Sequence, residues 1–382
     1  MMGIYEELGV PPVINAMGTF TIYGGSKMSP QTLRDMQEAA ASFVDIRLLQ
    51  RRLSQAVAEL THNEAAYICG GASCGVYLSL LAAIAKKRGK KVRHLSREDF
   101  YRSEVILFRS HRNPYDIVLD QLGVKLVELA YPNHSLKDPC GDILAAVTPD
   151  TAAVYYLESG WVAHGAPALS DVIRAARTAG IPVVLDAAAM LPPVENLWAY
   201  TAAGVDLAVF SGGKDLRGPQ SSGLIVGSLA LIDILLEEGF PTHGYGRMFK
   251  VGREEMAGLY SALKQSLAAD HEARKRDAEE QVTLARNMLG GHPLYEPLRS
   301  YPNEAGQPIP RVHVRLKTGT VSSGQILAFL TAGSPPVIAA DSGPDGFYLN
   351  PMTLTMAEME LICRRLLDFT EMPPGKEVHT DV

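Results

Sequence analysis

One lysine follows two glycines directly after a short apolar segment, at the end of the run 210–214. Ligands of open α/β sheets bind at the carboxyl ends of the strands, and glycines let the backbone come close to a bulky group. Lys214 is therefore positioned to form a Schiff base with a carbonyl ligand. We expect neighbouring Arg217 and partial burial to lower the pKa of its amine toward neutrality. The alternative is a surface lysine in a turn.

A carboxylate ends a second apolar segment, 183–186, and three alanines follow it. A carboxylate in such a place is costly unless it has a partner. The ring nitrogen of pyridoxal 5'-phosphate (PLP) is a suitable partner, because a nearby carboxylate keeps that ring protonated and makes it an electron sink. One helix and one strand separate Asp186 from Lys214, so both can reach the same edge of a sheet. The alternative is an aspartate that caps the next helix.

A glycine-rich loop between a strand and a helix, 69–75, could hold the phosphate of that cofactor. Backbone N–H groups of Gly71, Ala72 and Cys74 can face an anion, Ser73 adds a hydroxyl, and the following helix contributes its positive end. The loop lacks both G-x-G-x-x-G and G-K-[ST], so it is not a nucleotide loop of the usual kinds. A tight turn without a ligand is the alternative.

A fourth segment, 109–116, also follows an apolar run. The imidazole of His111 could stack on the cofactor ring, and Arg112 could bind a substrate carboxylate with two hydrogen bonds. The alternative is a helix-start turn built on Asn113 and Pro114, with a solvated arginine.

These four segments occur in the chain order, and at the strand ends, that a single PLP site requires. Lys214, Asp186 and His111 are the expected catalytic residues. The expected cofactor-binding residues are Gly71, Ala72, Ser73, Cys74, His111, Asp186, Ser211 and Lys214. No metal is expected, because Cys69 and Cys74 lack a second pair or a nearby histidine to complete a zinc site.

Short apolar runs alternate with helix-like segments from about residue 64, which is typical of a parallel sheet covered by helices. The candidate strands are 65–69, 105–108, 125–129, 152–157, 182–186, 206–210 and 224–226. Helical periodicity is clear at 75–87 and 168–178. We therefore predict a doubly wound α/β domain with a mainly parallel sheet over residues 46–252, after an N-terminal segment 1–45.

The alternation stops after Gly239, and the remaining chain predicts a different architecture. A polar helical stretch covers 253–288 and reads as a connector. A strand at 312–316, a helix at 325–330, short strands near Val337 and Phe347 and an amphipathic helix at 355–369 follow. We predict connector helices and a smaller C-terminal α+β domain over 253–382.

The composition limits the classes of function. With 47% apolar and 20% charged residues, the 382-residue chain has the composition of a compact globular protein. The net charge of −6 and the lack of a dense basic block disfavour nucleic acid as a partner. The acidic start and the short apolar runs indicate neither a signal peptide nor a membrane span, so we expect a cytoplasmic protein with reduced cysteines.

The sequence resembles the selenocysteine-synthase-like branch of the fold-type-I PLP enzymes, and within it is most similar to the D-glucosaminate-6-phosphate ammonia-lyase group. The segments that carry the resemblance are 13–18, 111–116, 186–193, 211–223 and 246–255. The resemblance implies an aminotransferase-like fold, Lys214 as the Schiff-base lysine, Asp186 as the partner of the pyridine nitrogen and the 71–75 loop as the phosphate site. It also implies a homodimer or a larger homo-oligomer.

Two departures from the family pattern affect the expected substrate. Bacterial selenocysteine synthases carry an extra N-terminal domain for their tRNA, whereas the catalytic pattern here begins by residue 13, so transfer-RNA chemistry is not expected. Met17, Cys69 and Cys74 also differ from the expected pattern, which indicates a substrate shifted from the aminosugar acid.

The expected reaction is α,β-elimination on a hydroxylated amino acid or an aminosugar acid, with or without a phosphate. Lys214 removes the Cα proton, a β-substituent such as hydroxide leaves, and the products are a 2-oxo acid and ammonia. The cations expected to hold substrate anions are Arg112, Arg217, Arg247 and Lys250. For 247–255, the alternative is the start of a helix with ordinary surface charges.

The sequence is also compatible with other functions. A PLP-dependent racemase, aldolase or aminotransferase would use the same lysine and aspartate. A non-catalytic PLP-binding or tRNA-interacting protein is the alternative from another class, and a basic face with a degraded lysine motif would favour it.

Overall fold

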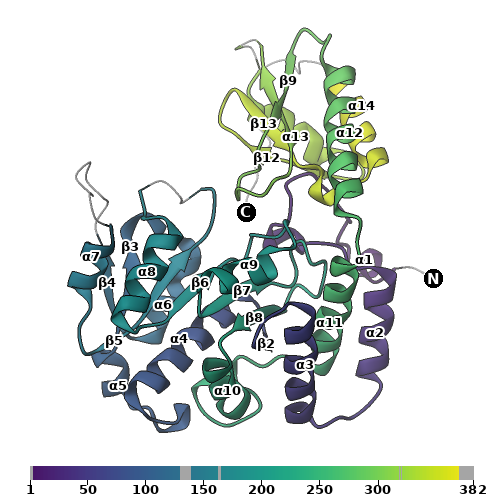
Figure 1. Ribbon diagram of the computed structural model, residues 1–382. Helices are drawn as coiled ribbons and strands as arrows, with labels where there is room; N and C mark the ends of the chain where they lie inside the picture. Colours follow the sequence, from purple (N-terminus) through teal and green to yellow (C-terminus); the bar gives the residue numbers. More distant parts are fainter. Residues whose placement is uncertain (1–2, 130–138, 162–164, 318, 320, 370–382) are drawn as a thin grey trace. The chain divides into compact units, whose positions relative to one another are not determined.

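The computed structural model describes residues 3–129, 139–161, 165–317, 319 and 321–369 (Figure 1). Its internal contacts divide the chain into two compact units. The larger unit holds residues 19–269 and 304–308, and the smaller unit holds the remaining described residues. This division differs from the predicted domains at three points: the predicted N-terminal segment 1–45 is split after residue 18, and both 253–269 and 304–308 belong to the larger unit.

A seven-stranded sheet forms the centre of the larger unit. In spatial order its strands are β2 (Ala65–Cys69), β8 (Gly223–Gly227), β7 (Leu207–Ser211), β6 (Val183–Asp186), β5 (Thr151–Leu157), β3 (Glu104–Phe108) and β4 (Lys125–Leu129). All seven predicted strands are present, and the mainly parallel sheet is confirmed. Only β8 runs antiparallel to its neighbours, because the connection from β7 is too short for a helical crossover.

Helices cover both faces of this sheet, so its strands are buried on two sides. Val183 and Leu185 enter one core and Val184 enters the other, as the alternation of side chains along a strand requires. The first core also contains side chains of α3 (Ile46–Leu60), α7 (Pro139–Ala146), α8 (Leu169–Ala179), α9 (Asn196–Ala203) and α11 (Arg253–Leu267). The second contains side chains of α4 (Ala72–Arg88), α5 (Arg97–Arg102), α6 (Ile117–Leu122) and α10 (Leu229–Glu238).

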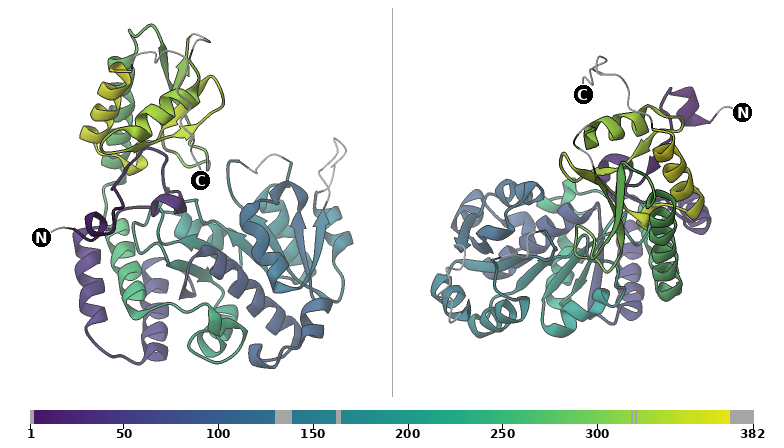
Figure 2. Two further views of the ribbon diagram at one scale, coloured as in Figure 1. Left: turned by 180° about the vertical axis from the view of Figure 1, so that it is seen from behind. Right: turned by 90° about the horizontal axis from the view of Figure 1, so that it is seen from above.

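The predicted polar connector at 253–288 is two helices in different units. The break follows Ala269, where the side chain of Asp270 accepts a hydrogen bond from the backbone of Ala273 and begins α12 (His271–Leu289). Met256, Leu259 and Leu263 bury one face of α11 in the core of the larger unit. On its other side α11 lies beside α2 (Pro30–Ala40), as the views in Figures 1 and 2 show.

The smaller unit is an α+β structure, as predicted. Its four-stranded antiparallel sheet has the order β12 (Ala340–Asp341), β13 (Gly346–Leu349), β10 (Arg311–Leu316) and β9 (Tyr295–Ser300). α12, α13 (Ser323–Ala332) and α14 (Met356–Leu367) bury apolar side chains with it. A separate parallel pair joins β1 (Ile14–Asn15) to β11 (Val337–Ile338). The sequence did not predict β9, which contains Pro297; as an edge strand it tolerates a proline.

Within the part of the chain that the structure describes, no helix is both long enough and apolar enough to cross a bilayer.

Candidate active site

Lys214 lies in a tightly closed loop that begins where β7 ends. The backbone N–H of Gly212 donates to the carbonyl of Ser222 at 2.9 Å, and that of Gly218 donates back to Gly212 at 2.8 Å. A Cβ at Gly213 would lie 2.5 Å from the Cα of Gln220, so a larger residue does not fit there. The glycines before Lys214 are therefore required by the close approach of two backbone segments.

The structure brings the side chains of Lys214 and Asp186 into electrostatic contact. Burial lowers the pKa of Lys214, and the charges of Asp186 and Glu304 oppose that shift. Burial raises the pKa of Asp186, while a hydrogen bond from the backbone of Ala188 at 3.0 Å and the charge of Lys214 oppose the shift. The hydroxyl of Tyr155 also donates to Asp186, at 3.3 Å. The expected partial burial of Lys214 is present.

The expected role of Arg217 differs from what the structure gives. Its side chain is exposed, and its backbone has a positive φ of 56°. The factors that move the pKa of Lys214 are burial, Asp186 and Glu304. Arg217 is therefore a residue of the loop surface, and burial alone accounts for the lowered pKa of the lysine.

The glycine loop between β2 and α4 has the geometry of an anion site. Gly71 precedes the helix with φ of 111°, and no side chain of the described residues caps this helix start. The N–H groups of Ala72, Ser73 and Cys74 form the first turn of α4, at its positive end. A Cβ at Gly223 would lie 2.5 Å from the carbonyl carbon of Gly71, so β8 packs tightly against the loop.

His111 ends a short 3-10 helix after β3 and is completely buried. Its Nδ1 accepts a hydrogen bond from the backbone of Leu157 at 3.3 Å, and the rings of Tyr156 and Phe108 approach it edge-on. Burial lowers its pKa to about 4, so the ring is neutral near pH 7 with its proton on Nε2. No described residue accepts a hydrogen bond from this Nε2. Stacking of His111 on a cofactor stays a prediction.

Arg112 does not have the free guanidinium that a substrate-binding role needs. It contacts Asp116 at 2.7 Å, Glu128 at 2.6 Å and Asp120 at 3.4 Å. Because three carboxylates already surround it, Arg112 has a structural role, and its contacts do not support the prediction that it binds a substrate carboxylate.

Two further predicted substrate cations, Arg247 and Lys250, lie between α10 and α11. The guanidinium of Arg247 lies over the ring of Phe240 at 5.2 Å, and Lys250 is exposed. A Cβ at Gly70 would lie 3.3 Å from the carbonyl oxygen of Lys250, so this segment passes beside the glycine loop. Ser211, predicted to bind the cofactor, is the half-buried last residue of β7.

Sequence reasoning missed three residues near this edge of the sheet. Tyr155 lies inside a strand that reads as uniformly apolar, and Glu158 directly follows the same strand. Glu304 lies in a polar stretch far along the chain, where no local pattern marks it. Burial raises the pKa of Glu158, whose charge acts on Tyr156 and Tyr200. A polar residue directly after a predicted strand was a usable signal for Glu158.

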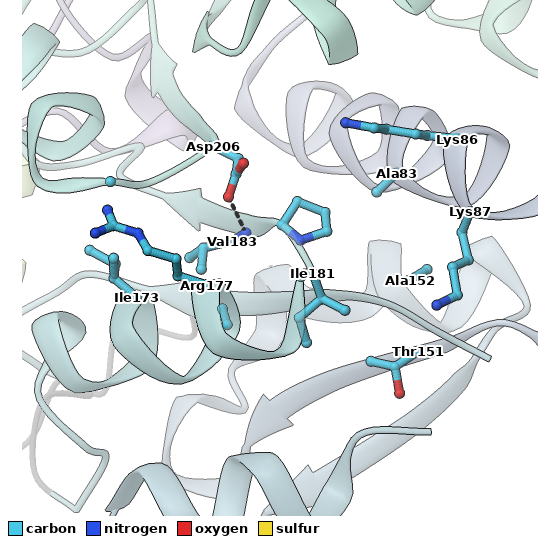
Figure 3. A pocket seen from close by; sticks show the side chains of 14 residues that line it. Ala83, Lys86, Lys87, Thr151, Ala152, Ile173, Arg177, Ile181, Val183 and Asp206 are labelled. Carbon is cyan, nitrogen blue, oxygen red and sulfur yellow. Dashed lines mark hydrogen bonds between the residues drawn. The ribbon is translucent and has the colours of Figure 1, made fainter. Parts of the chain in front are cut away.

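A cavity of about 430 Å³ lies at the opposite edge of the sheet, where β5, β6 and β7 begin (Figure 3). Figure 3 shows Asp206 between Arg177 and Lys86, with Asp206 accepting a hydrogen bond from Val183 at 2.8 Å. Lys86 and Arg177 belong to the last turns of α4 and α8, where cations complement the helix dipole. This cavity is remote from Lys214, and its charges have a structural explanation.

Within the described ranges, no cluster of three or more histidine, cysteine or acidic side chains could hold a metal ion. All four cysteines are free.

A family model described as "SelA: L-seryl-tRNA selenium transferase" matches residues 47–287. The chain is 29% identical to a D-glucosaminate-6-phosphate ammonia lyase of Salmonella typhimurium, over 96% of this chain and 98% of that protein. It is also 29% identical to a 5'-C-glycyluridine monooxygenase-decarboxylase of a Streptomyces species, over 98% and 94% of the two chains.

Among solved structures, a D-glucosaminate-6-phosphate ammonia-lyase superimposes with a TM-score of 0.79 at 26% identity, covering 96% of this chain and 97% of that chain. The structure of SPT with PLP internal aldimine matches with a TM-score of 0.57 at 13% identity, covering 93% and 87% of the two chains. The second match concerns the fold alone, which is that of fold-type-I PLP enzymes.

Proposed function

The chain belongs to the SelA family, and from that premise we propose that it is a PLP-dependent ammonia lyase. Its substrate would be a 2-amino-3-hydroxy acid, such as an aminosugar acid with or without a phosphate, and its products a 2-oxo acid and ammonia. The observation that carries the proposal is the half-buried pair of Lys214 and Asp186. This pair lies where β6 and β7 end, at the carboxyl ends of the strands, which we call the carboxyl edge of the sheet. The full-length similarity to an ammonia lyase supports the reaction type.

The residues present fit PLP. Asp186, with a backbone N–H on one side and the Tyr155 hydroxyl on the other, fits the pyridine nitrogen. The start of α4, without a side-chain cap among the described residues, fits the phosphate. The buried Nε2 proton of His111 would be satisfied by an acceptor on the bound group. When bound, PLP would withdraw electrons from the substrate Cα and so acidify its proton.

Lys214 would serve twice in this reaction. Its amine would hold the cofactor covalently until a substrate amine replaces it, and the released amine would then take the Cα proton. The lowered pKa of Lys214 supports both roles, because a larger fraction of the amine is neutral near pH 7. Loss of the Cα proton and of the β-hydroxyl releases one molecule of water. Hydrolysis of the resulting unsaturated amine then consumes one molecule of water and releases ammonia and the 2-oxo acid.

Arg217, Arg247 and Lys250 are proposed to hold the carboxylate or distal phosphate of the substrate. Arg217 is supported by its place three residues after Lys214, and Lys250 by its proximity to the glycine loop. Replacement of Arg247 by alanine tests this: we expect KM to rise about tenfold for a phosphorylated substrate, and an unchanged KM would remove Arg247 from the site.

The central test is a product assay with the purified PLP-loaded enzyme. We expect 2-amino-3-hydroxy acids to give equal amounts of ammonia and 2-oxo acid. Borohydride reduction followed by peptide mass spectrometry should find the cofactor on Lys214. Inverted amino acid, consumption of a second 2-oxo acid, or an aldehyde product would instead support a racemase, an aminotransferase or an aldolase.

A homodimer or a larger homo-oligomer is proposed as the assembly. Large apolar side chains of the larger unit are exposed, among them Ile22, Phe43 and Leu48, and such residues are common at subunit interfaces. Sedimentation equilibrium of the loaded enzyme tests this, and a monomer at micromolar concentration would contradict it.

A further inference from the structure

Residues 304–308 form a five-residue segment of the larger unit, although the residues before and after them in the sequence belong to the smaller unit. The backbone N–H of Gly160 donates to the carbonyl of Ala305 at 2.7 Å, and the side-chain amide of Gln307 donates to the carbonyl of Leu191. Ala305 and Gln307 are both buried. Gly160 follows β5 and Leu191 follows β6, so the segment lies against the carboxyl edge of the sheet.

The position of this segment is fixed by close backbone packing. A Cβ at Gly160 would lie 2.7 Å from the backbone nitrogen of Gly306, and Gly306 has a φ of 87°. Both positions therefore need glycine, and together they hold the chain next to the ends of β5 and β6.

Glu304 begins the segment and is half-buried. Its charge acts on Lys214 and raises the pKa of that amine, against the effect of burial. Asp186 is the other carboxylate that acts on Lys214, and it already has Ala188 and Tyr155 as hydrogen-bond donors. Glu304 is thus a second carboxylate whose charge acts on the lysine.

Glu158 is the rival carboxylate at the same edge of the sheet. Its charge acts on Tyr156 and Tyr200, and it is not among the charges that move the pKa of Lys214. Of these two carboxylates, Glu304 is the one whose charge acts on Lys214 and whose segment packs against residues that follow β5 and β6.

We propose that Glu304 is a catalytic residue that relays a proton from Lys214 to the departing β-oxygen of the substrate. The inference rests on the proposed function and identifies the substrate class as one whose leaving group must be protonated, namely β-hydroxy amino acids. Hydroxide is a poor leaving group, so a proton donor to that oxygen lowers the barrier substantially.

The relay conserves protons and electrons. Lys214 Nζ takes the Cα proton, and the electron pair of the broken C–H bond forms the new double bond between Cα and Cβ. The bond from Cβ to oxygen breaks with its electron pair on oxygen. Glu304 takes a proton from the Lys214 ammonium and gives one to that oxygen, so that water leaves. Lys214 returns to a neutral amine and Glu304 to a carboxylate, with no change in oxidation state overall.

The test compares leaving groups in the loaded enzyme. Chloride leaves without a proton, so the relay predicts that Glu304→Gln lowers kcat/KM on a 2-amino-3-hydroxy acid by about 100-fold or more, and on the 3-chloro analogue by less than about tenfold. Glu158→Gln is the matched control, and we expect it to lower both rates to a similar, small extent. Equal losses on both substrates in Glu304→Gln, or a larger hydroxyl-specific loss in Glu158→Gln, would overturn the relay.

A second measurement needs no turnover. In the apoenzyme, the pH at which Lys214 becomes reactive toward acetic anhydride, followed by peptide mass spectrometry, should be lower in Glu304→Gln than in wild type and unchanged in Glu158→Gln. An unchanged value in Glu304→Gln would contradict the electrostatic effect of Glu304 on Lys214, and with it the relay. A wild-type enzyme that releases no 2-oxo acid from either substrate would contradict the proposed function itself, whereas equal losses in an active enzyme contradict the relay alone.

Discussion

The two edges of the seven-stranded sheet each carry an aspartate close to cations. At the carboxyl edge Asp186 faces Lys214, and at the amino edge Asp206 lies near Lys86 and Arg177. Burial raises the pKa of both aspartates, and each accepts a backbone hydrogen bond. The cations differ: Lys214 is half-buried with a lowered pKa, whereas Lys86 and Arg177 are exposed. Pairing with a carboxylate is therefore shared, and burial of the amine is what distinguishes the reactive edge.

Helix α4 connects these two edges and presents opposite ends of its dipole to them. Its start, after Gly71, offers backbone N–H groups at the carboxyl edge. Its last turn holds Lys86, Lys87 and Arg88 and ends at Gly89, at the amino edge. The same helix thus favours an anionic ligand at one edge and cationic side chains at the other.

The largest expected effect comes from removing the buried amine. We expect Lys214→Ala to lower kcat/KM by about 1,000-fold or more, because the covalent link and the base are lost together. Lys86→Ala should change it by less than about twofold. Initial rates of 2-oxo acid release measure both, and a comparable loss in Lys86→Ala would erase the distinction between the edges.

Replacing each of the two aspartates by asparagine should show that one supports turnover and the other supports the stability of the fold. We expect Asp186→Asn to lower kcat on the order of 100-fold, because a neutral amide does not keep a pyridine nitrogen protonated. Asp206→Asn should retain kcat and cost about 1 kcal/mol of unfolding free energy, since one buried hydrogen bond is weakened. Turnover rates and urea unfolding of both variants provide the comparison.

The buried histidine of the carboxyl edge should make stability depend on pH. Its folded pKa of about 4 lies below the unfolded value of about 6.5, so the unfolded chain binds more protons between these values. Stability from this group is present above pH 6.5 and is lost as the pH falls toward 4, by on the order of 3 kcal/mol. Urea unfolding from pH 4 to 7 should show this slope in wild type and a reduced slope in His111→Gln. An equal slope in both proteins would refute the assignment.

The smallest effect concerns Arg112. It lies at the carboxyl edge, but like Lys86 and Arg177 at the amino edge it is a cation near carboxylates with a structural role. We expect Arg112→Ala to lower the unfolding free energy by about 1–2 kcal/mol, because the nearly buried Asp116 loses its partner. KM should stay within about twofold of wild type. A tenfold rise in KM with unchanged stability would restore the substrate-binding role that the sequence predicts for Arg112.

Local patterns in the sequence were sufficient for the strands, the lysine loop and the glycine loop. Alternating and continuous apolar runs reflect how a strand is buried by its immediate surroundings, so all seven strands of the larger sheet could be predicted. Gly213 and Gly71 stand where backbone geometry excludes larger residues, and that requirement is visible in the residue type itself. The chemistry of Lys214 and Asp186 followed from their places after two such strands.

Contacts between distant parts of the chain decided the rest. Nothing local in the sequence shows that Asp120 and Glu128 pair with Arg112. Nor does it show that Gly160 and Gly306 hold the segment of Glu304 at the end of β5, where its charge acts on Lys214. α11 has a polar sequence but belongs to the larger unit through one buried face. The sequence determined which groups could react and where strands end, whereas charge partners and burial come from side chains far apart in the chain, which no local pattern encodes.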